Sequence, residues 1–153
     1  MEIQSGSDVA SPALDSDGLR LYFRRLGLSD PEFVALSGAY GLGRHVSLFG
    51  MSKPCLKKLT RSCLEDAPVA LPFVASGADM FDNSYFQYLL RWYDRDVEVG
   101  DVAFIPTDVA LAVDGGLRRH VRRFAADKDS YFRTFTRAYQ KLVDTTATTI
   151  DRY

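Results

Sequence analysis

The stretch GLSDPEFVALSGAYGLGR, residues 27–44, decides the fold of this chain. Ser29 and Glu32 have the spacing of a capping box, in which each side chain can bond the backbone amide of the other residue. Pro31 suits the first turn of the helix that this box opens. The helix is predicted to reach Tyr40, after which two closely spaced glycines weaken it.

Apolar residues recur at helical spacing on both sides of this stretch. Upstream, the recurrence over 19–26 predicts a helix that stops at Gly27. Residues 44–80 hold three prolines and no steady period, so a long loop or insertion is expected there. Alternation typical of a strand appears only over 97–105. The fold class is therefore predicted to be all-α with long loops, and the downstream helices are expected at 83–93, 107–112, 117–124 and 127–142.

The composition of the chain excludes several classes of protein. The chain has 153 residues, 46% of them hydrophobic, and a formal net charge of -1, which fits one globular domain and favours neither nucleic acid nor an anionic membrane as partner. No apolar run is long enough for a transmembrane segment. The N-terminus shows no targeting peptide. Because the two cysteines form no disulfide framework, an intracellular protein is expected, with a mitochondrion or chloroplast left open. Cys55 and Cys63 are interpreted as ordinary loop thiols.

No catalytic constellation follows from spacing alone. The sequence has no glycine-rich phosphate loop and no metal-spaced cluster of histidine and cysteine, so no metal site is predicted. His45 and His120 stand alone and are interpreted as surface or packed side chains. The basic run LRRHVRR at 117–123 is interpreted as a solvated helix face. The residues by themselves indicate a helical domain with long loops.

Four motifs in order resemble the plant-type haem peroxidases, specifically the intracellular class that includes ascorbate peroxidase and cytochrome c peroxidase. The resemblance covers roughly residues 13–144 and only the second, proximal half of that family's domain. It implies an N-terminal arm at 1–16, a half-domain at 17–144 with an insertion at about 50–72, and a tail at 145–153. The motifs are the opening stretch, FDNSYF at 81–86, FIPTDVALAVD at 104–114 and RFAADKDSYFRTFTRAYQKL at 123–142.

The resemblance also shows where this chain departs from the family. Tyr40 occupies the position of the family's proximal histidine, the fifth ligand of the haem iron, and Asp82 that of the carboxylate beside it. Phe73 falls where the family has a redox-active tryptophan, and His45 is one place from a residue that contacts a haem propionate. Because a carboxylate raises the cost of forming a phenolate, we expect Tyr40 and Asp82 to be a neutral, hydrogen-bonded pair rather than an iron site.

The loss of the iron ligand, the tryptophan and the distal half favours a degenerate, non-catalytic protein. We expect it to serve as a structural or accessory subunit of a larger assembly, without a cofactor, with other protein subunits covering the apolar face of helix 30–40. The alternative is a haem b protein that reduces hydrogen peroxide or peroxynitrite, either with altered axial ligation or complemented by a second chain that carries the distal half. Catalysis by this chain alone is not expected; if it is active, it is a haem peroxidase.

Overall fold

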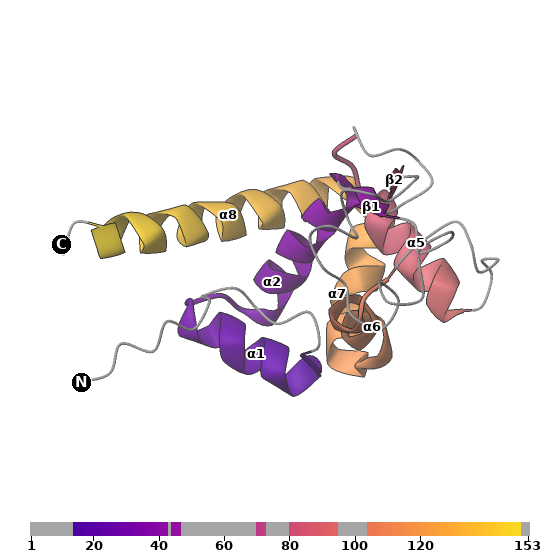
Figure 1. The fold of residues 1–153 in the computed structure, drawn as a ribbon, viewed down its shortest axis with the longest axis horizontal. Helices are drawn as coiled ribbons and strands as arrows, with labels where there is room; N and C mark the ends of the chain where they lie inside the picture. The colour runs from indigo at the N-terminus through magenta and orange to yellow at the C-terminus, as the bar shows by residue number, and fades with distance from the viewer. Residues whose placement is uncertain (1–13, 43, 47–69, 73–79, 95–103, 151–153) are drawn as a thin grey trace.

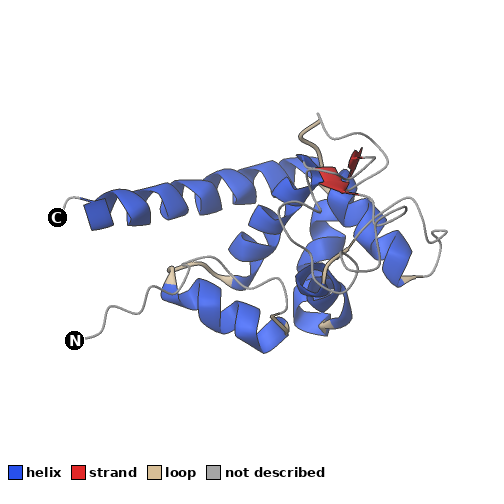
Figure 2. Ribbon diagram, viewed as in Figure 1, coloured by secondary structure: helices blue, strands red, loops and turns tan. Residues whose placement is uncertain are grey.

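The computed structural model describes residues 14–42, 44–46, 70–72, 80–94 and 104–150. These residues are helical apart from one short ribbon, which confirms the all-α class (Figures 1 and 2). The helices are α1 (Ser16–Arg25), α2 (Asp30–Ser37), the 3-10 helix η1 (Gly38–Leu42), α5 (Ser84–Tyr93), α6 (Pro106–Val113), α7 (Gly115–Ala126) and α8 (Lys128–Ile150).

The ribbon pairs β1 (Arg44–Val46) with β2 (Ala70–Pro72) in antiparallel register, with His45 opposite Leu71. Both strands lie in the stretch that the sequence analysis assigned to a loop. Three residues are too few to show a period of two, so no pattern could have predicted them. The alternation over 97–105 falls mostly outside the described residues, and the insertion at about 50–72 does so except for β2.

The predicted end of α1 and the predicted start of α2 are present, whereas α2 ends at Ser37 rather than at Tyr40, and the 3-10 helix η1 continues from it to Leu42. Gly27 has a φ of +75°, a left-handed conformation that suits glycine, and Leu28 N–H donates to the Phe23 carbonyl at 2.9 Å. This pattern is the Schellman motif that commonly ends a helix. At the start of α2, the backbone N–H and the hydroxyl of Ser29 both donate to Glu32 Oε2 at 2.9 Å. The capping residues therefore fix the turn between α1 and α2.

The core lies among α2, α5, α6 and α7, with the N-terminal part of α8 packed across α2 and α7 (Figure 1). α8 continues to Ile150, into the stretch expected to be a C-terminal tail. None of the described helices is long and apolar enough to cross a membrane. The largest fully buried side chains are Phe33, Val34, Leu28, Tyr85, Phe86, Leu89, Leu111, Leu117, Val121, Phe124 and Tyr131.

Glu32 ties α2 to α8. Its side chain is almost fully buried, and Lys141 Nζ lies 2.8 Å from Glu32 Oε1. Burial acts to raise the pKa of Glu32, but the hydrogen bonds from Lys141 and Ser29 outweigh it, so the pKa lies below its usual value. The carboxylate is therefore charged and paired, and it fixes the register of α8 against α2.

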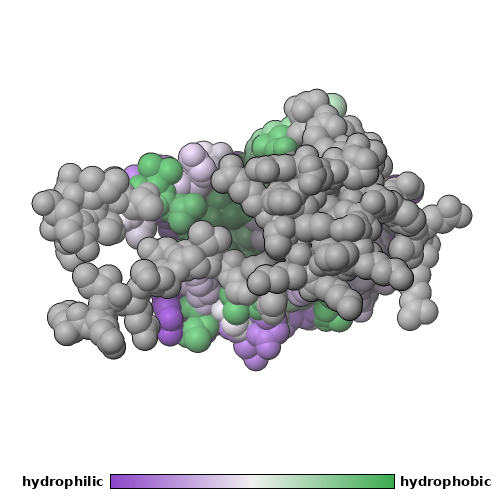
Figure 3. Space-filling view, viewed as in Figure 1, coloured by the Kyte–Doolittle hydropathy of each residue, from purple (hydrophilic) through white to green (hydrophobic). Residues whose placement is uncertain are grey.

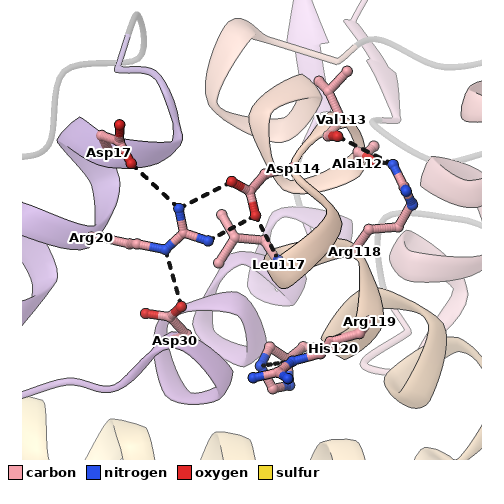
Figure 4. Close-up of polar contacts among 10 residues, drawn as sticks. All are labelled: Asp17, Arg20, Asp30, Ala112, Val113, Asp114, Leu117, Arg118, Arg119 and His120. Atoms are coloured by element: carbon pink, nitrogen blue, oxygen red, sulfur yellow. Dashed lines mark hydrogen bonds and ion pairs between the residues drawn. The ribbon is translucent and has the colours of Figure 1, made fainter.

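Arg20 joins three helices at the other end of the core (Figure 4). Its Nη1 and Nη2 donate to the two carboxylate oxygens of Asp114 at 3.0 and 2.7 Å, and its Nε donates to Asp30 at 3.1 Å. Asp114 also caps α7 by accepting from Leu117 N–H at 2.9 Å. The hydrogen bond from Arg20 holds the pKa of Asp114 well below its usual range. This cluster fixes α1 against the junction of α6 and α7.

Candidate functional site around Tyr40

Tyr40 lies in η1, which continues directly from α2. The first residue of η1, Gly38, lies at a crowded position, because a Cβ there would lie 2.7 Å from the Tyr131 hydroxyl oxygen and 2.8 Å from the Phe86 ring. Real Cβ atoms do not approach other atoms so closely, so only glycine fits without displacement of its neighbours. Tyr40 itself is half-buried and packs against the core.

The electrostatic surroundings of Tyr40 favour the neutral phenol. Burial raises the pKa of Tyr40, and the negative charge of Asp108 raises it further. A tyrosinate ligand needs the opposite influence, a positive charge that lowers the phenol pKa. The residues around Tyr40 therefore do not fit an iron-bound tyrosinate, and in the described part of the chain no group of three His, Cys, Asp or Glu side chains could hold a metal ion.

Asp82 lies immediately before α5 and helps to start that helix. Its Oδ1 accepts from the backbone N–H of Ser84 at 2.9 Å and also from the Ser84 hydroxyl. The charge of Asp82 acts on Tyr131, whose pKa is raised first by burial and then by this carboxylate. The expected hydrogen bond between Tyr40 and Asp82 stays a prediction.

The carboxylate whose charge reaches Tyr40 is one that the sequence analysis did not single out. Asp108 is 3% exposed and accepts a hydrogen bond of 2.5 Å from the hydroxyl of Tyr85, which is fully buried. It also accepts from Ile105 N–H at 2.9 Å. Burial raises the pKa of Asp108, and these two bonds partly offset that effect. The signal was available, because an acidic residue two places after Pro106 is the capping pattern of a helix start.

Tyr131 completes the surroundings of η1 from α8. Its side chain is fully buried, and its hydroxyl has no hydrogen-bond partner among the described residues. The ring contacts Phe86 at a centroid distance of 5.0 Å and Phe124 at 5.9 Å. The tyrosines at positions 40, 85 and 131 thus lie close enough for Tyr85 to feel the other two, and the charge of Asp108 acts on Tyr40 and Tyr85. The site is lined mainly by aromatic rings. Its two carboxylates, Asp82 and Asp108, already accept hydrogen bonds from backbone amides at the starts of α5 and α6.

The other predicted site residues are placed as follows. His45 lies in β1, where the structure fixes the backbone register. Phe73 lies outside the described residues, as do Cys55 and Cys63. His120 is buried on α7 and accepts a hydrogen bond of 3.3 Å from Arg119 Nε. The structure thus assembles the Tyr40 surroundings from η1, α5, α6 and α8.

Comparison with known proteins relates this site to a family. A peroxidase family model matches residues 2–127. The chain is 36% identical over 135 residues to a probable L-ascorbate peroxidase 5 (chloroplastic) of Oryza sativa subsp. japonica, covering 88% of this chain and 40% of that protein. It is 32% identical over 133 residues to a putative heme-binding peroxidase of Mycosarcoma maydis, covering 86% and 40%.

A third relative is the mitochondrial cytochrome c peroxidase of Emericella nidulans, with 31% identity over 142 residues, 85% of this chain and 34% of that protein. The chain thus spans 40% or less of the length of these relatives. These matches confirm the resemblance carried by the four sequence motifs. The chain belongs to the plant-type haem peroxidase family, with ascorbate and cytochrome c peroxidases among its relatives.

Proposed function

We propose that this chain is a degenerate member of the peroxidase family that acts as a structural or accessory subunit of a larger protein assembly and does not reduce peroxide by itself. The observation that carries the proposal is the neutral phenol at position 40. Burial and Asp108 both raise the pKa of Tyr40, so this side chain, at the position that resembles the family's proximal ligand, would be a poor ligand for iron.

A partner surface follows from the apolar side chains that the chain leaves partly exposed. On α2, Phe33 and Val34 are already covered within this chain, so the helix 30–40 surface open to a partner is the half-buried part near Leu36 and Tyr40. α8 adds Tyr139 and Val143, which are 55% and 47% exposed, and Figure 3 shows separate hydrophobic residues among polar ones in the region of this helix. Other protein subunits that cover these surfaces are part of the proposal.

Haem titration followed by absorption spectroscopy tests the cofactor half of the proposal. The native chain is expected to give no saturable Soret band, and Tyr40→Phe should behave identically. Tyr40→His restores the ligand type of the family and serves as the matched comparison. A saturable Soret band in the native chain that is lost in Tyr40→Phe would overturn the assignment, and peroxide-dependent oxidation of ascorbate by the native chain would overturn the non-catalytic role.

The second candidate is a haem-binding peroxidase or pseudoperoxidase that acts on hydrogen peroxide or peroxynitrite, with altered ligation or with a second chain supplying the distal half. The family match favours it, together with relatives that are named as heme-binding peroxidases. Light scattering and Soret spectra of the complex that copurifies with the chain separate the two candidates. An intracellular location is part of either proposal, and the chloroplastic and mitochondrial names of relatives support an organelle.

A further inference from the structure

The solvent-facing side of α7 carries three arginines and no carboxylate. Leu117, Val121 and Phe124 are buried on the opposite side of the helix. The α7 arginine face consists of three exposed residues, Arg119, Arg122 and Arg123. The helix contains no acidic residue.

No ion pair within the described residues neutralises the α7 arginine face. Arg119 donates to His120, and the Arg123 guanidinium lies over the Phe124 ring at 4.7 Å. The neighbouring Arg118 differs, because it donates to the Tyr93 hydroxyl and to the carbonyls of Ala112 and Val113, all within the fold (Figure 4 shows the two carbonyls). The α7 arginine face thus keeps only two weak contacts within the chain, and its charges are not paired with a carboxylate among the described residues.

The three charges act against the helix that carries them. Positions three and four apart are neighbours on a helix surface, and like charges at such positions destabilise it. Their effect reaches the interior: burial lowers the pKa of His120, and the charges of Arg119 and Arg123 lower it further. Arg123 lies in the last turn, where the helix dipole favours a cation, but its pairing with Arg119, and that of Arg119 with Arg122, are repulsive, and an external anion would turn these pairs into a favourable arrangement.

We propose that the α7 arginine face docks a carboxylate-rich surface of a partner protein. This inference rests on the proposed accessory role and names the chemistry of one partner surface. The planar guanidinium matches a carboxylate in a two-point contact, and arginine is enriched in protein interfaces. The net charge of -1 and the absence of an exposed aromatic ring among the described residues of α7 argue against single-stranded nucleic acid. The same face has no large apolar side chain to anchor it in a membrane surface.

Fluorescence anisotropy with a labelled peptide of alternating glutamate and glycine tests the proposal. The test variant is Arg119→Gln/Arg122→Gln/Arg123→Gln in the full chain. The matched control is Arg24→Gln/Arg25→Gln/Arg133→Gln, which removes the same charge at exposed positions elsewhere. We expect the test variant to bind the peptide about tenfold more weakly than the native chain, and the control to lose less than about threefold.

Helix content and thermal stability show whether the test variant is still folded. Far-UV circular dichroism should show unchanged helix content in the test variant, with a thermal midpoint within a few degrees of that of the native chain, since the repulsion that is removed offsets the lost contacts of Arg119 with His120 and of Arg123 with Phe124. If that variant does not fold, the single reversal Arg122→Glu replaces it, because no contact of Arg122 within the described residues would be lost.

Three outcomes overturn the docking proposal: no binding of the peptide to the native chain, equal losses in the two triple variants, or tighter binding of oligothymidine or phosphatidylserine vesicles than of the peptide. The proposed accessory role fails separately, through Soret absorbance or peroxide turnover by the native chain, neither of which depends on the α7 arginine face.

Discussion

Replacing Tyr131 with phenylalanine is expected to stabilise the chain. The hydroxyl of Tyr131 is buried and has no hydrogen-bond partner among the described residues. Folding therefore removes this group from water without a replacement bond. Phenylalanine keeps the ring that packs against Phe86 and Phe124 and removes only the unpaired oxygen.

The magnitude follows from two opposing terms. A buried polar group left unsatisfied costs about 1–3 kcal/mol, which the substitution recovers. The lost oxygen also gives up van der Waals contacts near Gly38, worth a few tenths of a kcal/mol. The free energy of unfolding should rise by about 1–2 kcal/mol. For a chain of this length, that corresponds to an increase of roughly 3–6 °C in the thermal midpoint.

Urea denaturation followed by far-UV circular dichroism measures the effect. The slope of the unfolding free energy against urea should not change, because the surface exposed on unfolding is the same. Tyr139→Phe is the matched control: its side chain is 55% exposed, so the free energy of unfolding should change by less than about 0.5 kcal/mol. A second test is Gly38→Ala, whose added methyl group lies closest to the Tyr131 oxygen and should cost less in a Tyr131→Phe background.

A loss of stability of about 1 kcal/mol or more in Tyr131→Phe would refute this reasoning, because it would show that the hydroxyl makes a stabilising hydrogen bond in the folded chain. Asp82 is the group to examine in that case, since its charge already acts on Tyr131.

Three further predictions concern buried polar groups. Tyr85→Phe should lower the free energy of unfolding by about 1–3 kcal/mol in urea denaturation, because Asp108 then keeps only its bond from the Ile105 amide; an unchanged value would contradict the assigned bond. His120 has a lowered pKa in the folded chain, so the unfolded chain binds more protons as the pH falls below about 6.5 and stability drops there. His120→Gln should lose less stability than the native chain between about pH 7.5 and 5.5, and parallel losses would be evidence against this role. Arg20→Gln should cost about 1–2 kcal/mol by chemical denaturation, discounted because the cluster is partly solvated, whereas the exposed control Arg24→Gln should cost less than about 0.5 kcal/mol.

Local signals in the sequence predicted the helices well. The capping box at Ser29 and Glu32 and the stop at Gly27 involve residues a few places apart, so a single sequence contains all the information needed. The same holds for Asp127, which accepts from Ser130 N–H at 2.9 Å at the start of α8. The cap of α6 was predicted two residues late, at Thr107 rather than at Ile105, because the hydroxyl of a threonine is a stronger capping signal than an isoleucine.

The contacts that build the site were not predictable in the same way. Two ion pairs join residues that lie far apart in the sequence: Arg20 with Asp114, and Glu32 with Lys141. No local pattern distinguishes these four residues from other charged residues. The surroundings of Tyr40 illustrate the point. Family resemblance directed attention to Asp82, but the charge that raises the pKa of Tyr40 belongs to Asp108, which only the packing of α6 brings near.

The pairing of α2 with α8 has a consequence for how the chain is made. α2 packs mainly against α8, a helix that follows about 90 residues later in the sequence, and Lys141 bonds Glu32 across this contact. During synthesis from the N-terminus, α2 emerges well before α8, on the order of ten seconds earlier at ordinary elongation rates. Its apolar residues then lack the cover that α8 supplies, so stable packing of α2 must wait for the synthesis of α8, and truncation before Lys128 would leave part of α2 exposed to chaperones and proteases.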